Sequence, residues 1–254
     1  MNEVPKEALR EYLLAFADDE HLMGQQHTEW IGVAPFLEED LAFSSIGQDE
    51  LGHSVLLYEL VSELDGTDPS SDAVIDALAY DRDAAEYRSS ALTEYATTDW
   101  AEALVRHWIY DIAEEMRWSL VADSTHAPLA AVAERVGREE SYHRMHANAL
   151  LDALLSSAKA KEKLLQALAT ISPLAAGLLG PTAGEEQLIA AGVIGESPSG
   201  LSDQLSKAIG NRFGTTGPSN SPSEYPRNSD RSESFSPLMA RMREVIEYDP
   251  GATW

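Results

Sequence analysis

Apolar residues recur every three or four positions through most of the first 160 residues, which is the spacing of one buried helix face. No segment there alternates in the way that a half-exposed strand does. The expected helices run over about 5–30, 36–64, 73–94, 100–122 and 128–156. The turns between them are short, and Pro5 and Pro128 suit the first turn of a helix. The pattern therefore predicts two antiparallel helix pairs.

The amino-acid composition of the chain changes after residue 157. KAKEKLLQALATI (159–171) continues helically until Pro173, and the glycine-rich stretch that follows predicts short helices. Residues 214–235 are dense in Ser, Pro, Asn and Gly, which is typical of an extended loop or a disordered segment. A last helix is expected at about 236–247. The predicted division is a bundle core (1–157), additional helices (158–213), a loop (214–235) and a C-terminal helix with its tail (236–254).

Charge and composition exclude several functions. The chain has 43 acidic and 18 basic residues, a net charge of −25, and only five lysines. Such a surface repels nucleic acid and anionic membranes. An acidic excess with scarce lysine is typical of proteins in a high-salt cytosol, although an acidic member of a larger complex has the same pattern.

Cysteine is absent, and no run of about 18 apolar residues could span a membrane. The N-terminus lacks the apolar core of a signal peptide. A protein of the cytoplasm is the expectation.

Two Glu-x-x-His motifs lie in the middle of predicted helices, at Glu50–His53 and Glu140–His143. One copy would arise by chance in a chain so rich in Glu, so the geometry decides their meaning. Residues i and i+3 lie on one helix face, so each pair can point at one ion. A metal site in a four-helix bundle also needs one carboxylate from each of the other two helices.

The missing carboxylates must lie at matching heights on the antiparallel partner helices. Glu20 is as far before Pro35 as Glu50 is after it, and it shares a face with apolar residues. For the second pair the same count points to Asp111. The separation of 30 residues from Glu20 to Glu50 then nearly equals the 29 from Asp111 to Glu140. Glu114 and Glu115 are the alternatives on that helix.

The predicted metal ligands are therefore Glu20, Glu50, His53, Asp111, Glu140 and His143. Four carboxylates and two imidazoles without cysteine favour two iron ions, or manganese, over zinc. Two Fe(II) ions with open positions can reduce dioxygen. Asp49, Glu139 and Tyr142 are candidates to hydrogen-bond the ligands.

The other candidate residues have simpler interpretations. His21, His27, His107, His126 and His146 are expected to be surface or capping histidines. Trp30, Trp108 and Trp118 are expected in the core or at subunit contacts. Lys159, Lys161 and Lys163 are expected to form a solvated helix start, with a CoA phosphate as the alternative partner.

At this point the sequence resembles the ferritin-like di-iron proteins, and more narrowly the large subunits of the multicomponent phenylacetyl-CoA epoxidase (ring 1,2-epoxidase). TEWIGVAPFLEEDLAFSSIGQDELGHSVLLYEL (28–60) is similar to the N-terminal helix pair of the C-type subunit. REESYHRMH (138–146) resembles the fourth bundle helix. SPLMARMREVIEYDPGATW (236–254) resembles the C-type tail, and we expect it to dock on a partner subunit.

The resemblance implies an all-α, ferritin-like antiparallel four-helix bundle with extra C-terminal helices. It also implies a homologous large subunit, small subunits, a flavin/iron–sulfur reductase, dioxygen and an aryl-CoA substrate. In this family the A-type subunit carries the di-iron site, whereas the C-type subunit is a scaffold that has lost several ligands. Here the tail is of C-type while the ligand pattern is complete. A non-catalytic scaffold and a ferritin- or rubrerythrin-like iron oxidase are the alternatives.

Overall fold

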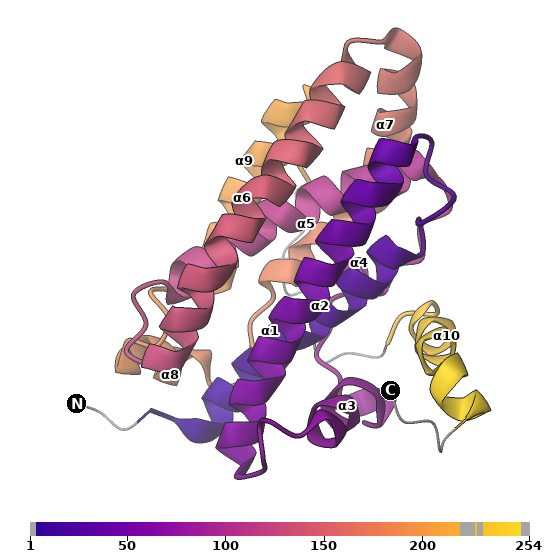
Figure 1. Ribbon diagram of the computed structural model, residues 1–254. Coiled ribbons are helices and arrows are strands. Elements are labelled where there is room, and N and C mark those ends of the chain that lie inside the picture. The colour runs from indigo at the N-terminus through magenta and orange to yellow at the C-terminus, as the bar shows by residue number, and fades with distance from the viewer. Residues whose placement is uncertain (1–3, 219–226, 228–230, 250–254) are drawn as a thin grey trace.

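Four long helices form the body of the protein in a computed structural model that describes residues 4–218, 227 and 231–249 (Figure 1). The four are α1 (Lys6–Thr28), α2 (Leu37–Asp65), α5 (Trp100–Val121) and α6 (Ala127–Leu155). Helices α1 and α2 pack along each other, α5 packs on α6, and α2 meets α6 to join the two pairs. The predicted ferritin-like helical bundle is confirmed, and the described residues contain no strand.

Local sequence explains where these helices begin and end. α5 begins after Asp99, whose side chain accepts a hydrogen bond from the N–H of Glu102 at 3.0 Å. α6 begins after His126, whose Nδ1 accepts from the N–H of Leu129, so the capping role expected of His126 is confirmed. α2 ends at Gly66, which adopts a left-handed conformation (φ 74°) that a residue with a Cβ rarely takes.

The helix expected over 73–94 is the main error of the secondary-structure prediction. α3 covers only Asp72–Tyr80, and it is followed by the short helices η1 (Ala84–Glu86) and α4 (Ala91–Glu94). The backbone N–H of Arg88 donates to Asp18 at 2.6 Å, and that of Ser90 donates to Asp19 at 2.7 Å. These buried carboxylates of α1 need donors, so the chain between η1 and α4 is extended instead of helical.

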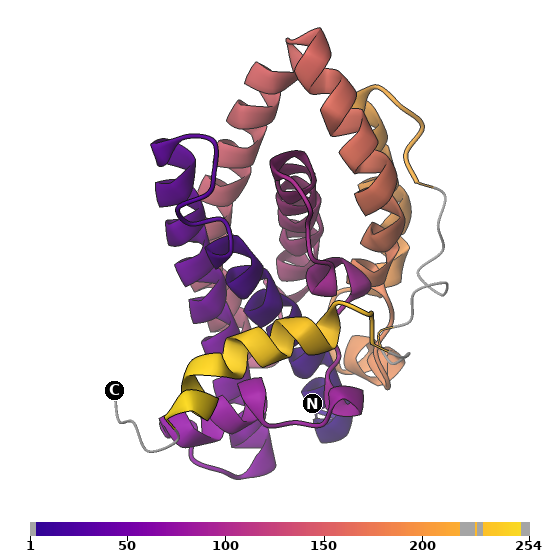
Figure 2. The same ribbon diagram turned by 90° about the vertical axis from the view of Figure 1, so that its right-hand side faces the viewer.

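The C-terminal third adds a layer of shorter helices. Their bounds are α7 (Ala158–Ile171), η2 (Ser172–Leu179), α8 (Glu185–Ala191), η3 (Pro198–Leu201), α9 (Ser202–Phe213) and α10 (Phe235–Tyr248). α7 packs on α5, α8 packs on α1, and α10 crosses one side of the bundle against α3 (Figures 1 and 2). Half of the predicted loop (219–226 and 228–230) and the last residues of the tail (250–254) lie outside the described residues.

The start of the tail docks on its own chain. Phe235, Leu238 and Met239 are buried against Leu22 and Tyr87. The docking of the tail on a partner subunit stays a prediction. Val245, Ile246 and Tyr248, at the other end of the helix, are exposed.

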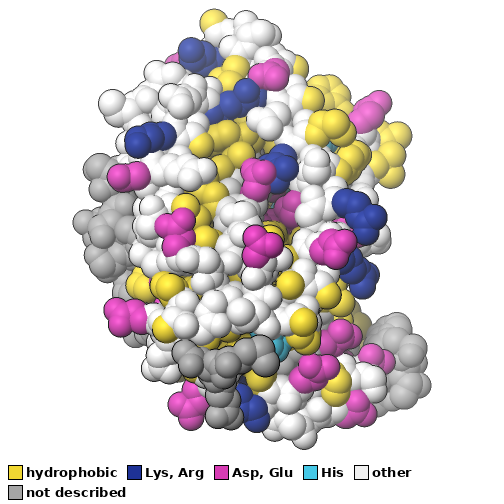
Figure 3. Space-filling view, turned by 90° about the vertical axis from the view of Figure 1, so that its left-hand side faces the viewer, with side chains coloured by type: hydrophobic (Ala, Val, Ile, Leu, Met, Phe, Trp, Pro, Cys, Tyr) yellow, Lys and Arg dark blue, Asp and Glu magenta, His cyan; other side chains and the backbone are white. Residues whose placement is uncertain are grey.

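The buried apolar side chains form two large clusters. One includes Phe16, Leu57 and Trp118, and the other includes Trp108 and Leu168. Burial of Trp108 and Trp118 confirms their predicted place in the core. None of the described helices has the length and apolar character that a membrane span needs. Acidic side chains are spread over the face in Figure 3 among basic and apolar ones.

Candidate metal centre

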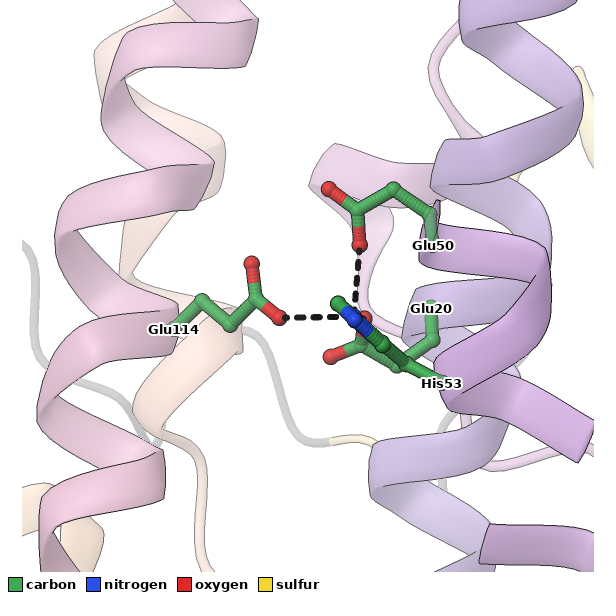
Figure 4. Close-up of side chains that lie close together, drawn as sticks. All are labelled: Glu20, Glu50, His53 and Glu114. Atoms are coloured by element: carbon green, nitrogen blue, oxygen red, sulfur yellow. Dashed lines mark ion pairs between the residues drawn. The ribbon is translucent and has the colours of Figure 1, made fainter. Parts of the chain in front are cut away.

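Six buried acidic and histidine side chains, from all four long helices, lie close together in the interior of the bundle. They are Glu20 of α1, Glu50 and His53 of α2, Glu114 of α5, and Glu140 and His143 of α6. Each is at most 2% exposed. Figure 4 shows Glu114 reaching from α5 toward Glu20, Glu50 and His53 on the opposite helix pair. Five of the six are among the ligands predicted from the sequence.

Nδ1 of His53 lies at the centre of the first group. It is 3.5 Å from Glu20, 3.9 Å from Glu50 and 4.0 Å from Glu114. One ligand atom from each of these four residues lies within 4.8 Å of the other three, so a single ion could reach all of them. Glu140 is also close, at 3.4 Å from the same nitrogen.

A second group adjoins the first and shares Glu50 with it. Nδ1 of His143 is 3.3 Å from Glu140 and 3.7 Å from Glu50, and one atom of each residue lies within 4.8 Å of the others. Glu50 and Glu140 thus each approach both histidines. Carboxylates placed between two nitrogen ligands are suited to bridging two cations.

Nε2 of each histidine contacts the acid that directly precedes the other Glu-x-x-His motif. Nε2 of His53 lies 2.8 Å from Glu139, and Nε2 of His143 lies 3.2 Å from Asp49. Because an ionised carboxylate only accepts hydrogen bonds, Nε2 carries a proton and Nδ1 faces the interior. The structure places Asp49 and Glu139 as the sequence suggested, whereas Tyr142 is exposed.

Two acids of α5, the predicted Asp111 and its alternative Glu114, lie near the histidines of the bundle interior. Glu114, the alternative, belongs to the first group, while Asp111 belongs to neither. Asp111 is fully buried one turn earlier, 3.1 Å from Nδ1 of His107, and its charge still helps to raise the pKa of Glu50 and His143. Glu115 points outward and pairs with Arg144. Both carboxylate oxygens of Asp111 are buried without a hydrogen-bond partner, so Asp111 as the ligand from α5 stays a prediction, with Glu114 as its alternative.

Burial and mutual repulsion hold protons on this cluster. The pKa values of Glu50 and Glu114 are raised well above the ordinary value, first by burial and then by the neighbouring carboxylates. Burial alone would raise the pKa of Glu20, but the hydrogen-bonding groups of His53, Glu50 and Glu114 close to it, together with the charge of His53, lower it overall. The pKa of His143 rises to about 10, because Asp49 and Glu140 outweigh the burial that would lower it.

The donor set fits two hard or borderline cations. Both carboxylate oxygens of Glu20, Glu50 and Glu140, and Nδ1 of both histidines, are buried without a hydrogen-bond partner. Leaving so many polar atoms unpaired in the interior is costly. The four carboxylates, once ionised, balance two divalent cations, and oxygen with imidazole donors suits iron or manganese.

Three histidines expected at the surface are buried. His27 Nε2 lies 3.2 Å from His107 Nδ1 in the interior, and His21 is packed against Tyr80. Burial lowers the pKa of His27 well below its ordinary value and that of His21 to about 4. Helix α1 is covered on several sides, by α2, α4 and α8, and nothing in its apolar pattern indicated this.

A buried ion network next to Glu20 was also missed. Asp19 accepts hydrogen bonds from Arg117 at 2.8 Å and from Arg227 at 2.6 Å. Asp18 pairs with Arg82 and accepts from Tyr58. The adjacent acids of Asp18-Asp19-Glu20 thus have different environments, and only Glu20 faces the histidines. The run of three acids within an otherwise apolar segment was the available signal.

The whole chain, residues 1–254, matches the family described as phenylacetic acid catabolic protein. The chain belongs to this family. The family predicted from the helix motifs is therefore confirmed.

Two curated relatives from Escherichia coli (strain K12) are components of one enzyme, 1,2-phenylacetyl-CoA epoxidase. The chain is 29% identical to its C-type subunit over 146 residues, which are 58% of this chain and 57% of the relative. It is 25% identical to the A-type subunit over 138 residues, which are 54% of this chain and 42% of that relative. The match spans about half the length of these curated relatives.

Proposed function

We propose that this chain is a metal-bearing subunit of a multicomponent di-iron monooxygenase that epoxidises the ring of phenylacetyl-CoA or a similar aryl-CoA. One observation supports this most directly: two adjoining groups of buried carboxylates and histidines that share Glu50. A chain that served only as a scaffold would have no use for such a cluster, because unpaired buried carboxylates destabilise the fold.

In this proposal the ligands are Glu20, Glu50, His53, Glu140 and His143, with Glu114 or Asp111 from α5. Two bound iron ions would supply the reduction of dioxygen and the insertion of an oxygen atom into the ring. Manganese fits the same donors. The chain's own residues hold the ions, and Asp49 and Glu139 orient the imidazoles. The apolar clusters on either side keep bulk water away.

The partners in this proposal are a homologous large subunit, small subunits and a flavin/iron–sulfur reductase. The two relatives, one of C-type and one of A-type, support a pair of homologous large subunits. The C-type tail and the full set of ligands then describe a C-like chain that has kept its metals.

Metal analysis of the purified chain, alone and with its partner subunits, tests the proposal. We expect about two irons per chain, as in two-metal sites generally. Glu50→Ala should lower the content most, because Glu50 belongs to both groups. Glu134→Gln, an exposed position on α6, is the matched control. Metal-free protein that binds its partner tightly would instead identify a scaffold.

Activity requires a separate measurement. Oxygen consumption with the reductase should depend on phenylacetyl-CoA. Consumption that needs only Fe(II) would identify an iron oxidase and contradict the proposed substrate class.

A further inference from the structure

A group of exposed apolar side chains surrounds the connection between α1 and α2. These residues, called the turn patch below, are between 46% and 69% exposed: Ile31, Val33, Phe36, Leu37 and Leu41. The connection is well ordered, because the N–H groups of Gly32 and Ala34 both donate to Asp40 Oδ1, at 3.0 and 3.1 Å. Several large apolar side chains exposed on one fixed turn are typical of an interaction surface.

A series of ring contacts leads inward from this patch. Trp30, next to Ile31, lies 5.4 Å from Trp100 between ring centroids. Trp100 lies 4.7 Å from Phe43, and Phe43 lies 5.2 Å from His107. Trp30 is fixed in turn by a hydrogen bond from its Nε1 to Thr97 at 3.2 Å. Trp30 and Trp100 are partly exposed, whereas Phe43 and His107 are fully buried.

The inner end of the series lies beside the candidate metal centre. His107 Nδ1 is 3.1 Å from Asp111, and the His107 ring also contacts that of His146, one turn after His143. Aromatic contact is therefore continuous from an exposed apolar surface to the side chains around the second group.

We propose that the turn patch is the docking surface of a one-electron donor protein with an iron–sulfur cluster, and that electrons enter through Trp30, Trp100 and Phe43. This rests on the proposed function, which requires electrons from outside the chain. In each step one electron leaves the reduced cluster, which is oxidised by one unit, and one ferric ion of the centre becomes ferrous. No covalent bond forms or breaks, and the aromatic side chains are unchanged afterwards.

The charge around the turn patch and the size of the patch indicate which kind of protein binds there. The chain has a net charge of −25, and Glu38 is exposed beside Leu37. A matching donor presents an apolar centre with a basic rim, since opposite charges steer association. Electron-transfer encounters use small interfaces, of under about 1,200 Å², which suits a patch built on a single turn.

The absence of cysteine permits a direct test, because one introduced cysteine gives a single labelling site. A photoactive ruthenium complex attached to Val33→Cys injects an electron after a flash, and loss of ferric absorbance reports its arrival in the iron-loaded protein. The control label is at Ser70→Cys. Ser70 is exposed, and it lies as many residues after His53 as Val33 lies before Glu50.

Three substitutions distinguish aromatic residues that carry electrons from aromatic residues that only pack in the core. Trp100→Leu and Phe43→Leu should slow reduction from position 33 by at least about tenfold, since the protein's part in such chemistry is to position the groups that couple donor and acceptor. Trp108→Leu should not, because Trp108 packs against Phe213 outside the series. Equal rates from positions 33 and 70, or insensitivity to Trp100→Leu and Phe43→Leu, would overturn the proposal. No reduction from either label would mean that the metal centre itself, and so the proposed function, fails.

Docking is tested without metal. The probe is a whole flavin/iron–sulfur reductase, and the readout is its Kd for the metal-free chain. Leu37→Glu should weaken binding by about tenfold or more, as loss of an apolar contact at the centre of an interface does. Tyr142→Glu, at an exposed aromatic residue on α6, should leave it unchanged. If Leu37→Glu instead abolishes association with the homologous large subunit while donor binding stays normal, the patch is a contact between large subunits and the proposal is wrong.

Discussion

Glu139 of α6 lies 2.8 Å from Nε2 of His53 on α2, although its neighbour in sequence, Glu140, belongs to the other motif. The converse contact joins Asp49 to His143 at 3.2 Å. Each Glu-x-x-His motif thus supplies, one residue before its glutamate, the acid that orients the histidine of the other motif. The two helices are linked through their histidines as well as through any shared ion.

Removing one of these outer acids should weaken metal binding without removing a ligand. We expect Glu139→Gln and Asp49→Asn each to lower metal affinity by about 10- to 100-fold, because the histidine loses the partner that fixes its ring. Competition with a chelator measures the affinity. Glu134→Gln, at an exposed position of α6, should have no effect. Unchanged affinity in Glu139→Gln would mean that the contact plays no part in binding.

The acid that α5 contributes can be identified by substitution. Glu114→Ala should lower the iron content, because Glu114 lies in the first group with Glu20 and His53. Asp111→Ala should lower it only if Asp111 turns from His107 toward the ions. Glu115→Ala is the control, since Glu115 is exposed and pairs with Arg144. Full iron content in Glu114→Ala together with loss in Asp111→Ala would restore the assignment made from the sequence.

Metal binding should strengthen as pH rises. The raised pKa values of Glu50 and Glu114, and that of about 10 for His143, keep protons on the metal-free cluster, and a cation must displace them. Groups with raised pKa values stabilise the metal-free fold at low pH, and this stabilisation is lost as pH rises through those values. The difference in Tm between loaded and metal-free protein should therefore widen from about pH 6 to about pH 9. A constant difference would contradict the proton competition.

The network around Asp19 should contribute strongly to stability. Asp19 is fully buried and accepts from Arg117, Arg227, the N–H of Ser90 and the hydroxyl of Thr93. Asp19→Ala leaves two buried guanidinium groups without their carboxylate, which should cost about 3–5 kcal/mol. Urea unfolding measures the change. The exposed pair Arg10–Asp65 offers a comparison, since Asp65→Ala should cost about 1 kcal/mol or less.

Salt should stabilise the chain. A net charge of −25 produces self-repulsion in the folded state that added ions screen. We expect Tm to rise steadily with KCl, and to rise with NaCl by a similar amount, because the effect is one of screening. A Tm that falls with salt would show that surface ion pairs outweigh the repulsion.

The sequence predicts best the features that depend only on residue spacing, namely the positions of the long helices and the relative heights of residues on paired helices. The four long helices follow from apolar periodicity, with ends set by Pro5, Asp99 and Gly66. In two antiparallel helices joined by a short turn, equal distances from the turn mean equal heights, since each residue adds the same rise. Glu20 could therefore be matched to Glu50 without a structure, and the two lie in one group.

The tertiary structure alone decided which side chains share an environment. Glu114 and Asp111 are three residues apart on α5, and the rotation of that helix in the bundle sends one to His53 and the other to His107. The break before Ser90 and the burial of His27 likewise depend on segments distant in sequence, which supply or require hydrogen bonds. Periodicity determines that a helix has an inner face, whereas the packing of other helices around it determines which partners that face meets.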